Sequence, residues 1–256
     1  MKQIDNPFSL TTGTIGYPVL FVMLMWVVFW IEIRFKVSFT TFGIYPQRLE
    51  GLKGIIFSPL IHGSLKHLFN NSIPILLLTL FLFYFYRKES WKVLLFGLLF
   101  TGLLTWIIGR PSYHIGASGM VYMLVFFLFF KGILSKYYRL IALSLIVVFL
   151  YGGLIWYIFP IEDGVSWEGH LSGSIVGTLF AFIFKGTIRK PKLYAWEQDD
   201  YKPDDDPFMR QFDENGNFIE LPKEEPPLDE EPPAVPNIRI HYTYKKSDEE
   251  GSGGGL

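Results

Sequence analysis

The chain of 256 residues contains no cysteine. A disulfide framework, a thiolate nucleophile and a zinc site built on cysteine are therefore excluded. An excess of charge of one sign is also missing, because 23 basic and 24 acidic residues leave a net charge of −1. A nucleic-acid binder with a strongly basic face is not indicated, and we expect no nucleic-acid partner.

The near-zero net charge hides two regions of opposite sign. Residues 1–192 contain 17 Lys and Arg against 7 Asp and Glu, a net charge of +10. Residues 193–256 contain 6 basic against 17 acidic residues, a net charge of −11, and eight of the 16 prolines. A segment so acidic and so poor in apolar residues does not form a core. We therefore expect residues 187–256 to be a disordered, acidic, proline-rich tail.

Two stretches of this tail carry patterns of local structure. In Phe212–Leu221, the pair Asn215-Gly216 is typical of a hairpin turn. In Asn237–Tyr244, apolar and aromatic residues alternate with polar ones as they do in a β-strand. The sequence offers neither stretch a partner sheet, so we expect both to be disordered.

The region before the tail contains six apolar stretches, and about 20 helical residues suffice to cross a bilayer. They run over Gly16–Ile33, His67–Tyr86, Trp91–Ile108, Ser118–Lys131, Tyr138–Phe159 and Glu168–Phe184. The fourth of them is short. The sequence predicts an all-α polytopic membrane protein with an N-terminal segment (1–15), a six-helix membrane domain (16–186) and the tail.

Basic residues gather in alternate connections between these stretches. They follow the second, fourth and sixth stretches, at Arg87, Lys88, Lys92, Lys131, Lys136, Arg139, Lys185, Arg189, Lys190 and Lys192. Connections rich in Lys and Arg stay in the cytoplasm. The first connection is also basic, but the three others outweigh it. We therefore expect an integral multi-pass protein of a bacterial cell (inner) membrane, with both termini in the cytoplasm.

Polar residues inside membrane spans are functional candidates by default. His67 and Asn71 lie four residues apart, as do Ser118 and Tyr122, so each pair shares one face of its helix. His170 lies at the start of the sixth stretch. These polar groups all lie at the outer ends of their predicted spans.

Glycines surround the serine and follow the histidine. Gly116 and Gly119 flank Ser118 and allow a tight turn into the helix, while Gly173 and Gly177 continue a stripe of small residues behind His170. Such a stripe lets two membrane helices approach closely. A histidine on one of these helices then comes within reach of a serine on the other.

Together these residues indicate a reaction centre for acyl transfer. Ser118 is the candidate nucleophile and His170 its general base and later acid. The Asn71 amide and His67, with backbone N–H groups near Ser118, are candidates for holding the oxyanion. Tyr122 lies one turn below Ser118, where it can pack on the imidazole. With no buried aspartate in evidence, a Ser/His dyad is favoured, and we interpret Glu168 as an interfacial charge.

With these motifs in place, the sequence resembles the rhomboid family of intramembrane serine proteases. The resemblance rests on His62–Asn71, on Gly116–Gly119 with Tyr122, and on Gly169-His170 with the glycines that follow, in the family's order and over residues 16–186. It implies a six-helix bundle, the dyad and oxyanion donors named above, a cap formed by Pro160–Trp167, and the fifth span as a lateral gate for substrate helices. The Trp-Arg pair often seen in the first connection is absent between Arg34 and Lys66.

The resemblance implies a serine endopeptidase that cuts the transmembrane or juxtamembrane segments of membrane proteins entering from the lipid bilayer. Neither a cofactor nor a metal is expected, because the histidines lack His-Glu-x-x-His spacing. The alternatives are a small transporter, for which no internal repeat is found, and a non-catalytic rhomboid-like protein that binds or escorts membrane clients. The sequence leaves the oligomeric state and the natural substrate open.

Overall fold

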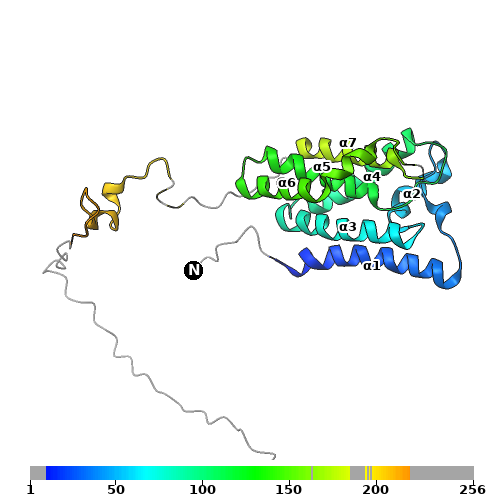
Figure 1. The fold of residues 1–256 in the computed structure, drawn as a ribbon, viewed down its shortest axis with the longest axis horizontal. Coiled ribbons are helices and arrows are strands. Elements are labelled where there is room, and N and C mark those ends of the chain that lie inside the picture. Colours follow the sequence, from blue (N-terminus) through cyan, green and yellow to red (C-terminus); the bar gives the residue numbers. More distant parts are fainter. Residues whose placement is uncertain (1–9, 163, 185–193, 195, 197, 220–256) are drawn as a thin grey trace, which may run out of the picture. The chain divides into compact units, whose positions relative to one another are not determined.

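The computed structural model describes residues 10–162, 164–184, 194, 196 and 198–219. Six long helices follow the six predicted stretches (Figure 1): α1 (Thr12–Phe35), α3 (Leu65–Phe85), α4 (Ser90–Ile108), α5 (Ser118–Leu134), α6 (Tyr138–Tyr151) and α7 (Trp167–Ile183). The described residues contain no β-strand, only two isolated bridges. The prediction of an all-α bundle is confirmed. The chain divides into two units, Met1–Pro191 and Lys192–Leu256.

Four segments of the described chain are long and apolar enough to cross a membrane: α1, α3, α4, and α6 with its extension to Ile158. The helices α5 and α7 have 17 residues each, so each measures about 25 Å at 1.5 Å per residue. The hydrocarbon core of a bilayer is about 30 Å thick. The two helices that carry the serine and the histidine are thus shorter than the four segments that are long enough to cross a membrane.

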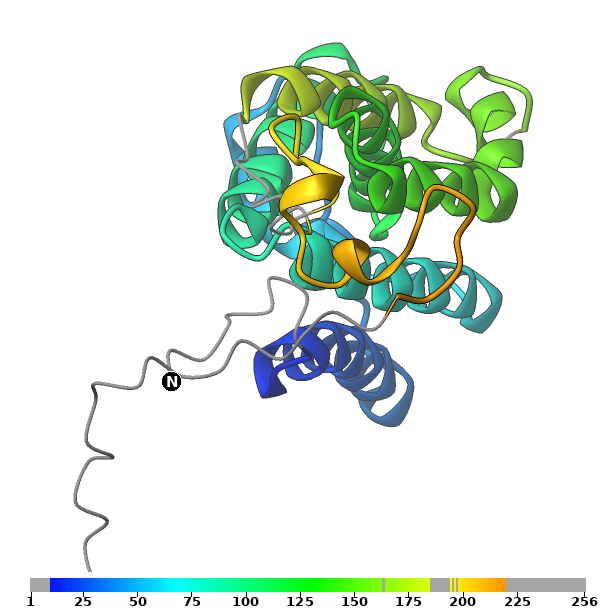
Figure 2. The same cartoon turned by 90° about the vertical axis from the view of Figure 1, so that its left-hand side faces the viewer.

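The core of the bundle is built around α5, which contacts α3, α4, α6 and α7. Its side chains are apolar on all sides, and Leu124, Phe127 and Leu128 are fully buried. A helix that is hydrophobic all round is buried by its neighbours. Seen from the end, α1 lies at the edge of the bundle beside α3 (Figure 2). The outer helices instead expose large apolar side chains, among them Trp30 and Phe149, as expected of a surface that faces lipid.

The contact between α5 and α7 is a contact between backbones. A Cβ atom added to Gly173 would collide with the carbonyl oxygen of Gly119, and one added to Gly177 would collide with the carbonyl oxygen of Met123. Only glycine permits such an approach. The stripe of small residues on α7 therefore faces α5 and brings the starts of the two helices together.

The far ends of the same two helices are joined by Lys131. Its amine is buried and donates to the carbonyl oxygens of Ala181 and Phe184 at the end of α7. The last carbonyls of a helix lack partners within it, so this lysine supplies donors that they need.

The first connection folds into short turns rather than a loose loop. It contains η1 (Thr40–Phe42), η2 (Leu49–Lys53), α2 (Gly54–Phe57) and η3 (Ser58–Leu60). Backbone hydrogen bonds join Ile44 to His114, and the Trp106 indole donates to the Arg48 carbonyl over 2.9 Å. These contacts brace the connection against the segment that precedes Ser118, in a chain that lacks the Trp-Arg pair.

The fifth span differs from its prediction as one continuous helix. It is α-helical only as far as Tyr151 and continues as the 3₁₀ helix η4 (Gly152–Ile158). The change falls at Gly152-Gly153, where two poor helix formers weaken the α-helix. The tighter 3₁₀ winding redirects the backbone carbonyls of this segment.

The described part of the second unit carries more local structure than its composition predicts. It contains η6 (Pro203–Asp205) and η7 (Met209–Gln211), and Phe212 pairs with Phe218 across a turn. Asp213 accepts hydrogen bonds from two backbone N–H groups of this turn, and Gly216 has a φ of 80°. We expected this stretch to be disordered, but the Asn215-Gly216 turn is formed, because the aspartate holds it without a partner sheet. The strand-like stretch Asn237–Tyr244 lies outside the described residues.

Candidate active site

The structure brings Ser118 and His170 into hydrogen-bond contact. Ser118 is the first residue of α5 and His170 lies in the first turn of α7. The Ser118 Oγ and the His170 Nε2 are 2.9 Å apart. The two residues are 52 positions apart in the chain, and the glycine contact between α5 and α7 is what brings them together.

The second nitrogen of the His170 ring is held by the backbone. Its Nδ1 lies 2.8 Å from the carbonyl oxygen of Tyr157 in η4. A carbonyl can only accept, so Nδ1 carries the proton and Nε2 presents its lone pair to the Ser118 hydroxyl. This is the tautomer that a general base for the serine requires.

Tyr122 fixes the plane of the same imidazole. Its ring stacks on His170 with the centroids 4.2 Å apart and an angle of 11° between the planes. Its hydroxyl donates to the carbonyl oxygen of Leu154 over 2.7 Å. Tyr122 and His170 therefore each make a hydrogen bond to a carbonyl of η4.

The position of Glu168 corrects the interpretation from the sequence. We expected an interfacial charge, but the residue is 1% exposed. Its Oε1 accepts from the backbone N–H of Arg110 over 3.2 Å and lies 3.5 Å from the Arg110 Nε. The carboxylate is thus paired with the α4–α5 connection, while the partner of the His170 Nδ1 is a carbonyl.

His67 lies beside the turn that leads to Ser118. A Cβ atom on Gly116 would come within 2.6 Å of the His67 ring, and Gly116 has a φ of 104°, where glycine is favoured. Asn71 is buried and donates one amide hydrogen to the His67 carbonyl over 2.9 Å. An amide nitrogen carries two hydrogens, so one donor of Asn71 remains for another acceptor.

A cavity of about 40 Å³ adjoins the serine. Its lining includes Ser118, Ser58, Thr101 and Thr105. The Thr101 hydroxyl is buried and has no hydrogen-bond partner among the described residues. A cavity needs roughly 10–15 Å³ and a few polar partners to hold a water molecule, so this one is large and polar enough to do so.

Two other histidines contact backbone carbonyls near the site. His62 is buried and its Nδ1 lies 3.4 Å from the Leu60 carbonyl. His114 contacts the Arg110 carbonyl over 3.1 Å and the Ser166 hydroxyl over 2.5 Å. Burial lowers the pKa of His114, so its ring is neutral near pH 7.

Sequence reasoning missed three groups around the site. The Tyr157 carbonyl carries no sequence signal, because every residue has one. Ser166 caps α7 by accepting from the Gly169 N–H, and a serine just before a predicted helix is a recognisable N-cap signal. Arg110 stood in the sequence as an isolated charge, and only the fold supplies Glu168 as its partner.

Comparisons with known proteins identify the family of the chain. A family model described as "Rhomboid domain" matches residues 50–187, more than half of the chain. The chain is 36% identical over 160 residues to "Uncharacterized protein Rv1337" of Mycobacterium tuberculosis and to "Uncharacterized protein Mb1372" of Mycobacterium bovis. These alignments cover 59% of this chain and 66% of each relative, so the chain spans slightly less than two thirds of their length.

A further mycobacterial relative aligns over a longer segment. "Uncharacterized protein ML1171" of Mycobacterium leprae is 31% identical over 182 residues, which cover 67% of this chain and 72% of the relative. The match to the family model covers all three motifs around Ser118, His67 and His170. The chain is an integral membrane protein of the rhomboid family.

Proposed function

We propose that the protein is an intramembrane serine endopeptidase that uses Ser118 and His170 as a catalytic dyad. The observation that carries the proposal is the 2.9 Å contact between the Ser118 Oγ and the His170 Nε2. It is reinforced by the Tyr157 carbonyl, which selects the tautomer with a free Nε2 lone pair. The membership of the rhomboid family supports the same reaction.

The chemistry follows from these two side chains. The Ser118 Oγ attacks the carbonyl carbon of the scissile peptide bond while its proton passes to the His170 Nε2. The C–N bond then breaks, and the imidazolium returns the proton to the leaving amine. A water molecule, activated by the same Nε2, attacks the acyl ester and releases Ser118 with its proton. The Tyr157 carbonyl accepts from Nδ1 throughout and stabilises the charged ring.

The negative charge of the tetrahedral intermediate needs donors on the other side of Ser118. A helix leaves its first N–H groups without partners inside it, and those of α5 begin at Ser118 itself. His67, which packs on Gly116, and the remaining Asn71 amide hydrogen are the side-chain candidates. Donors of this kind, fixed before the reaction begins, are worth about 10²–10³ in rate.

The cavity beside Ser118 supplies a place for the hydrolytic water. Its hydroxyl groups, from Ser58, Thr101 and Thr105, lie on α4 and on the first connection. A water molecule held by these hydroxyl groups lies next to the acyl ester on Ser118. Hydrolysis inside a membrane protein thus becomes feasible.

The proposed route for substrates is lateral, between the fifth span and the bundle. The segments α6 and η4 expose large apolar side chains, including Phe149 and Trp156, to the lipid. The connection Pro160–Trp167 follows η4 and is the proposed cap. In this proposal both termini lie in the cytoplasm, so a reporter enzyme fused after Leu256 will show cytoplasmic activity, and a periplasmic signal would contradict the orientation.

The rival proposal is a non-catalytic protein that binds membrane clients without cutting them. Such a protein has no need of a hydrogen bond between a serine and an oriented histidine. The dyad geometry therefore favours the protease.

The test uses purified full-length protein in detergent with a single-span reporter substrate. Wild type is expected to cut the reporter, and Ser118→Ala and His170→Ala are expected to lose at least about 10³-fold in kcat, since removing a dyad member leaves only binding and oxyanion stabilisation. Ser38→Ala, which changes an exposed serine of the first connection, serves as the matched control. If Ser118→Ala cuts as fast as wild type, the proposed mechanism is wrong. A fluorophosphonate probe that labels wild type but not Ser118→Ala gives independent support.

A further inference from the structure

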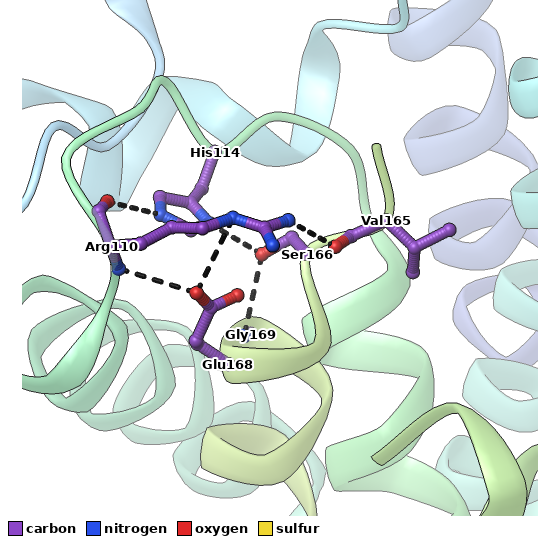
Figure 3. A network of polar contacts seen from close by, with 6 residues as sticks. All are labelled: Arg110, His114, Val165, Ser166, Glu168 and Gly169. Carbon is purple, nitrogen blue, oxygen red and sulfur yellow. Dashed lines mark hydrogen bonds and ion pairs between the residues drawn. The ribbon is translucent and has the colours of Figure 1, made fainter. Parts of the chain in front are cut away.

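A second set of contacts joins the segment before Ser118 to the segment before His170 (Figure 3). The Arg110 backbone N–H and its Nε both face the Glu168 Oε1, at 3.2 and 3.5 Å. The Arg110 Nη2 donates to the Val165 carbonyl over 2.5 Å. One arginine thus holds the end of the cap connection and the first turn of α7 at once.

His114 closes the network from the other side. Since the Arg110 carbonyl can only accept, the His114 Nε2 donates to it, and in the neutral ring Nδ1 accepts from the Ser166 hydroxyl. The Ser166 oxygen in turn accepts from the Gly169 N–H. Each hydrogen bond of this network therefore has one donor and one acceptor. The last bond is donated by the backbone of α7 at Gly169, next to His170.

The burial of Glu168 shows that stability alone does not account for the network. The carboxylate is 1% exposed, and its Oε2 has no hydrogen-bond partner among the described residues. Its partner Arg110 has a side chain 43% exposed. Burying an incompletely paired carboxylate at the membrane costs free energy, and an apolar residue there would avoid that cost.

The network controls a degree of freedom that the glycine contact leaves open. The contact between Gly119 and Gly173 fixes how far apart α5 and α7 lie, but it contains no side chain that sets the rotation of α7 about its own axis. Glu168 lies two residues before His170, and His114 lies four residues before Ser118. Polar contacts at these positions fix the rotation and the height of the first turn of α7 relative to the serine.

We infer that Glu168 is a positioning residue, which with Arg110 pins the first turn of α7 to the α4–α5 connection and so sets the distance between His170 and Ser118. The inference rests on the proposed function, because only a dyad makes that distance matter. Displacing a reacting group by about 1 Å costs about 10²-fold in rate. The carboxylate therefore acts through geometry and does not touch the substrate.

The experiment compares Glu168→Ala, Glu168→Gln and the control Glu50→Ala, which removes an exposed acid. We expect Glu168→Ala to lower kcat on the reporter about 10²-fold with KM within about twofold of wild type. Glu168→Gln keeps an oxygen that accepts from the Arg110 N–H, so it should recover kcat to within about fivefold of wild type. The double variant Arg110→Ala with Glu168→Ala should lose less kcat than the product of the two single losses, since the two residues share one contact.

A second measurement does not depend on activity. Hydrogen exchange of the peptide over residues 165–172 should speed up about tenfold or more in Glu168→Ala while exchange in α3 stays unchanged. Unchanged exchange in this peptide, or a kcat for Glu168→Ala equal to that of wild type, would overturn the inference. A kcat loss that merely matches the loss of folded protein would overturn it as well. If Ser118→Ala is inactive while Glu168→Ala is fully active, only this inference fails. If Ser118→Ala is active, the proposed function fails, and the hydrogen exchange alone then tests whether Glu168 holds the first turn of α7.

Discussion

Backbone packs directly on backbone where α7 meets α5, whereas η4 reaches the same pair of residues through two hydrogen bonds. On the first side, glycines leave no side chain to rearrange, and Gly173 lies against the Gly119 carbonyl. On the second side, the carbonyls of Leu154 and Tyr157 hold Tyr122 and His170. Close packing resists displacement steeply, while a hydrogen bond contributes only about 0.5–1.5 kcal/mol net. The dyad therefore has a rigid neighbour, the contact between α5 and α7, and a less rigid one, η4. The less rigid neighbour belongs to the proposed gate.

The largest effect on this comparison is expected from one carbon atom added at the contact between α5 and α7. Gly173→Ala should lower kcat about 10²-fold, because the new Cβ collides with the Gly119 carbonyl and separates the helices. Gly16→Ala in α1, where a Cβ meets nothing within 4 Å, is the matched control. Both changes raise helix propensity by about 1 kcal/mol. Reporter cleavage and thermal unfolding check the comparison, and a Gly173→Ala enzyme with wild-type kcat would show that the contact is not rigid.

A milder change separates the two roles of Tyr122. Tyr122→Phe keeps the ring that stacks on His170 but removes the hydroxyl that donates to the Leu154 carbonyl. Hydrogen exchange of residues 152–158 should rise roughly three- to tenfold, the range that one net hydrogen bond allows. The same amides in Tyr151→Phe, another tyrosine next to η4, should exchange as in wild type. Equal exchange in wild type and Tyr122→Phe would mean that the hydroxyl does not hold η4.

Acid is expected to lower the stability of the fold through His62 in the first connection. Burial, and then the neighbouring His67, lower the pKa of His62 to about 4. The unfolded chain binds a proton at this residue near pH 6.5, so the free energy of unfolding should fall as the pH drops from 6.5 to about 4 and then level off. A loss of 1 kcal/mol corresponds to about 2–4 °C in melting temperature for a chain of this size. His62→Gln should melt with a smaller pH dependence than His241→Gln, a matched change in the tail; identical pH dependence would contradict the assignment.

Much of the fold and the reacting pair could be predicted because they depend on side chains, which the sequence specifies directly. Ser118 and His170 are rare polar groups in apolar stretches, and the glycines beside them point to a close contact of helices. Apart from the end of the fifth span, the helix boundaries were predicted to within a few residues for the same reason, since charges and glycines mark them. Features that depend on the types of residues are therefore predicted well from the sequence.

The features that could not be predicted depend on backbone atoms and on long-range partners, which the residue types do not reveal. The Tyr157 carbonyl that orients His170 is a backbone atom, and its direction depends on the switch to a 3₁₀ helix after Tyr151. Glu168 looks like any charge at a span end until Arg110, 58 residues away, is placed beside it. Long-range partners and backbone directions appear only once the chain is folded.

The shortness of α5 and α7 has a consequence for how the protein is made. Each helix is about 25 Å long, so neither matches the thickness of a bilayer without distortion or neighbours. The four longer apolar segments, α1, α3, α4 and α6 with η4, are each long and apolar enough to cross a membrane. We expect the ribosome-bound chain to insert these first and to recruit α5 and α7 into the space between them. The reacting pair then forms only when the last helix has arrived, so a half-made chain has no means of cutting its neighbours in the membrane.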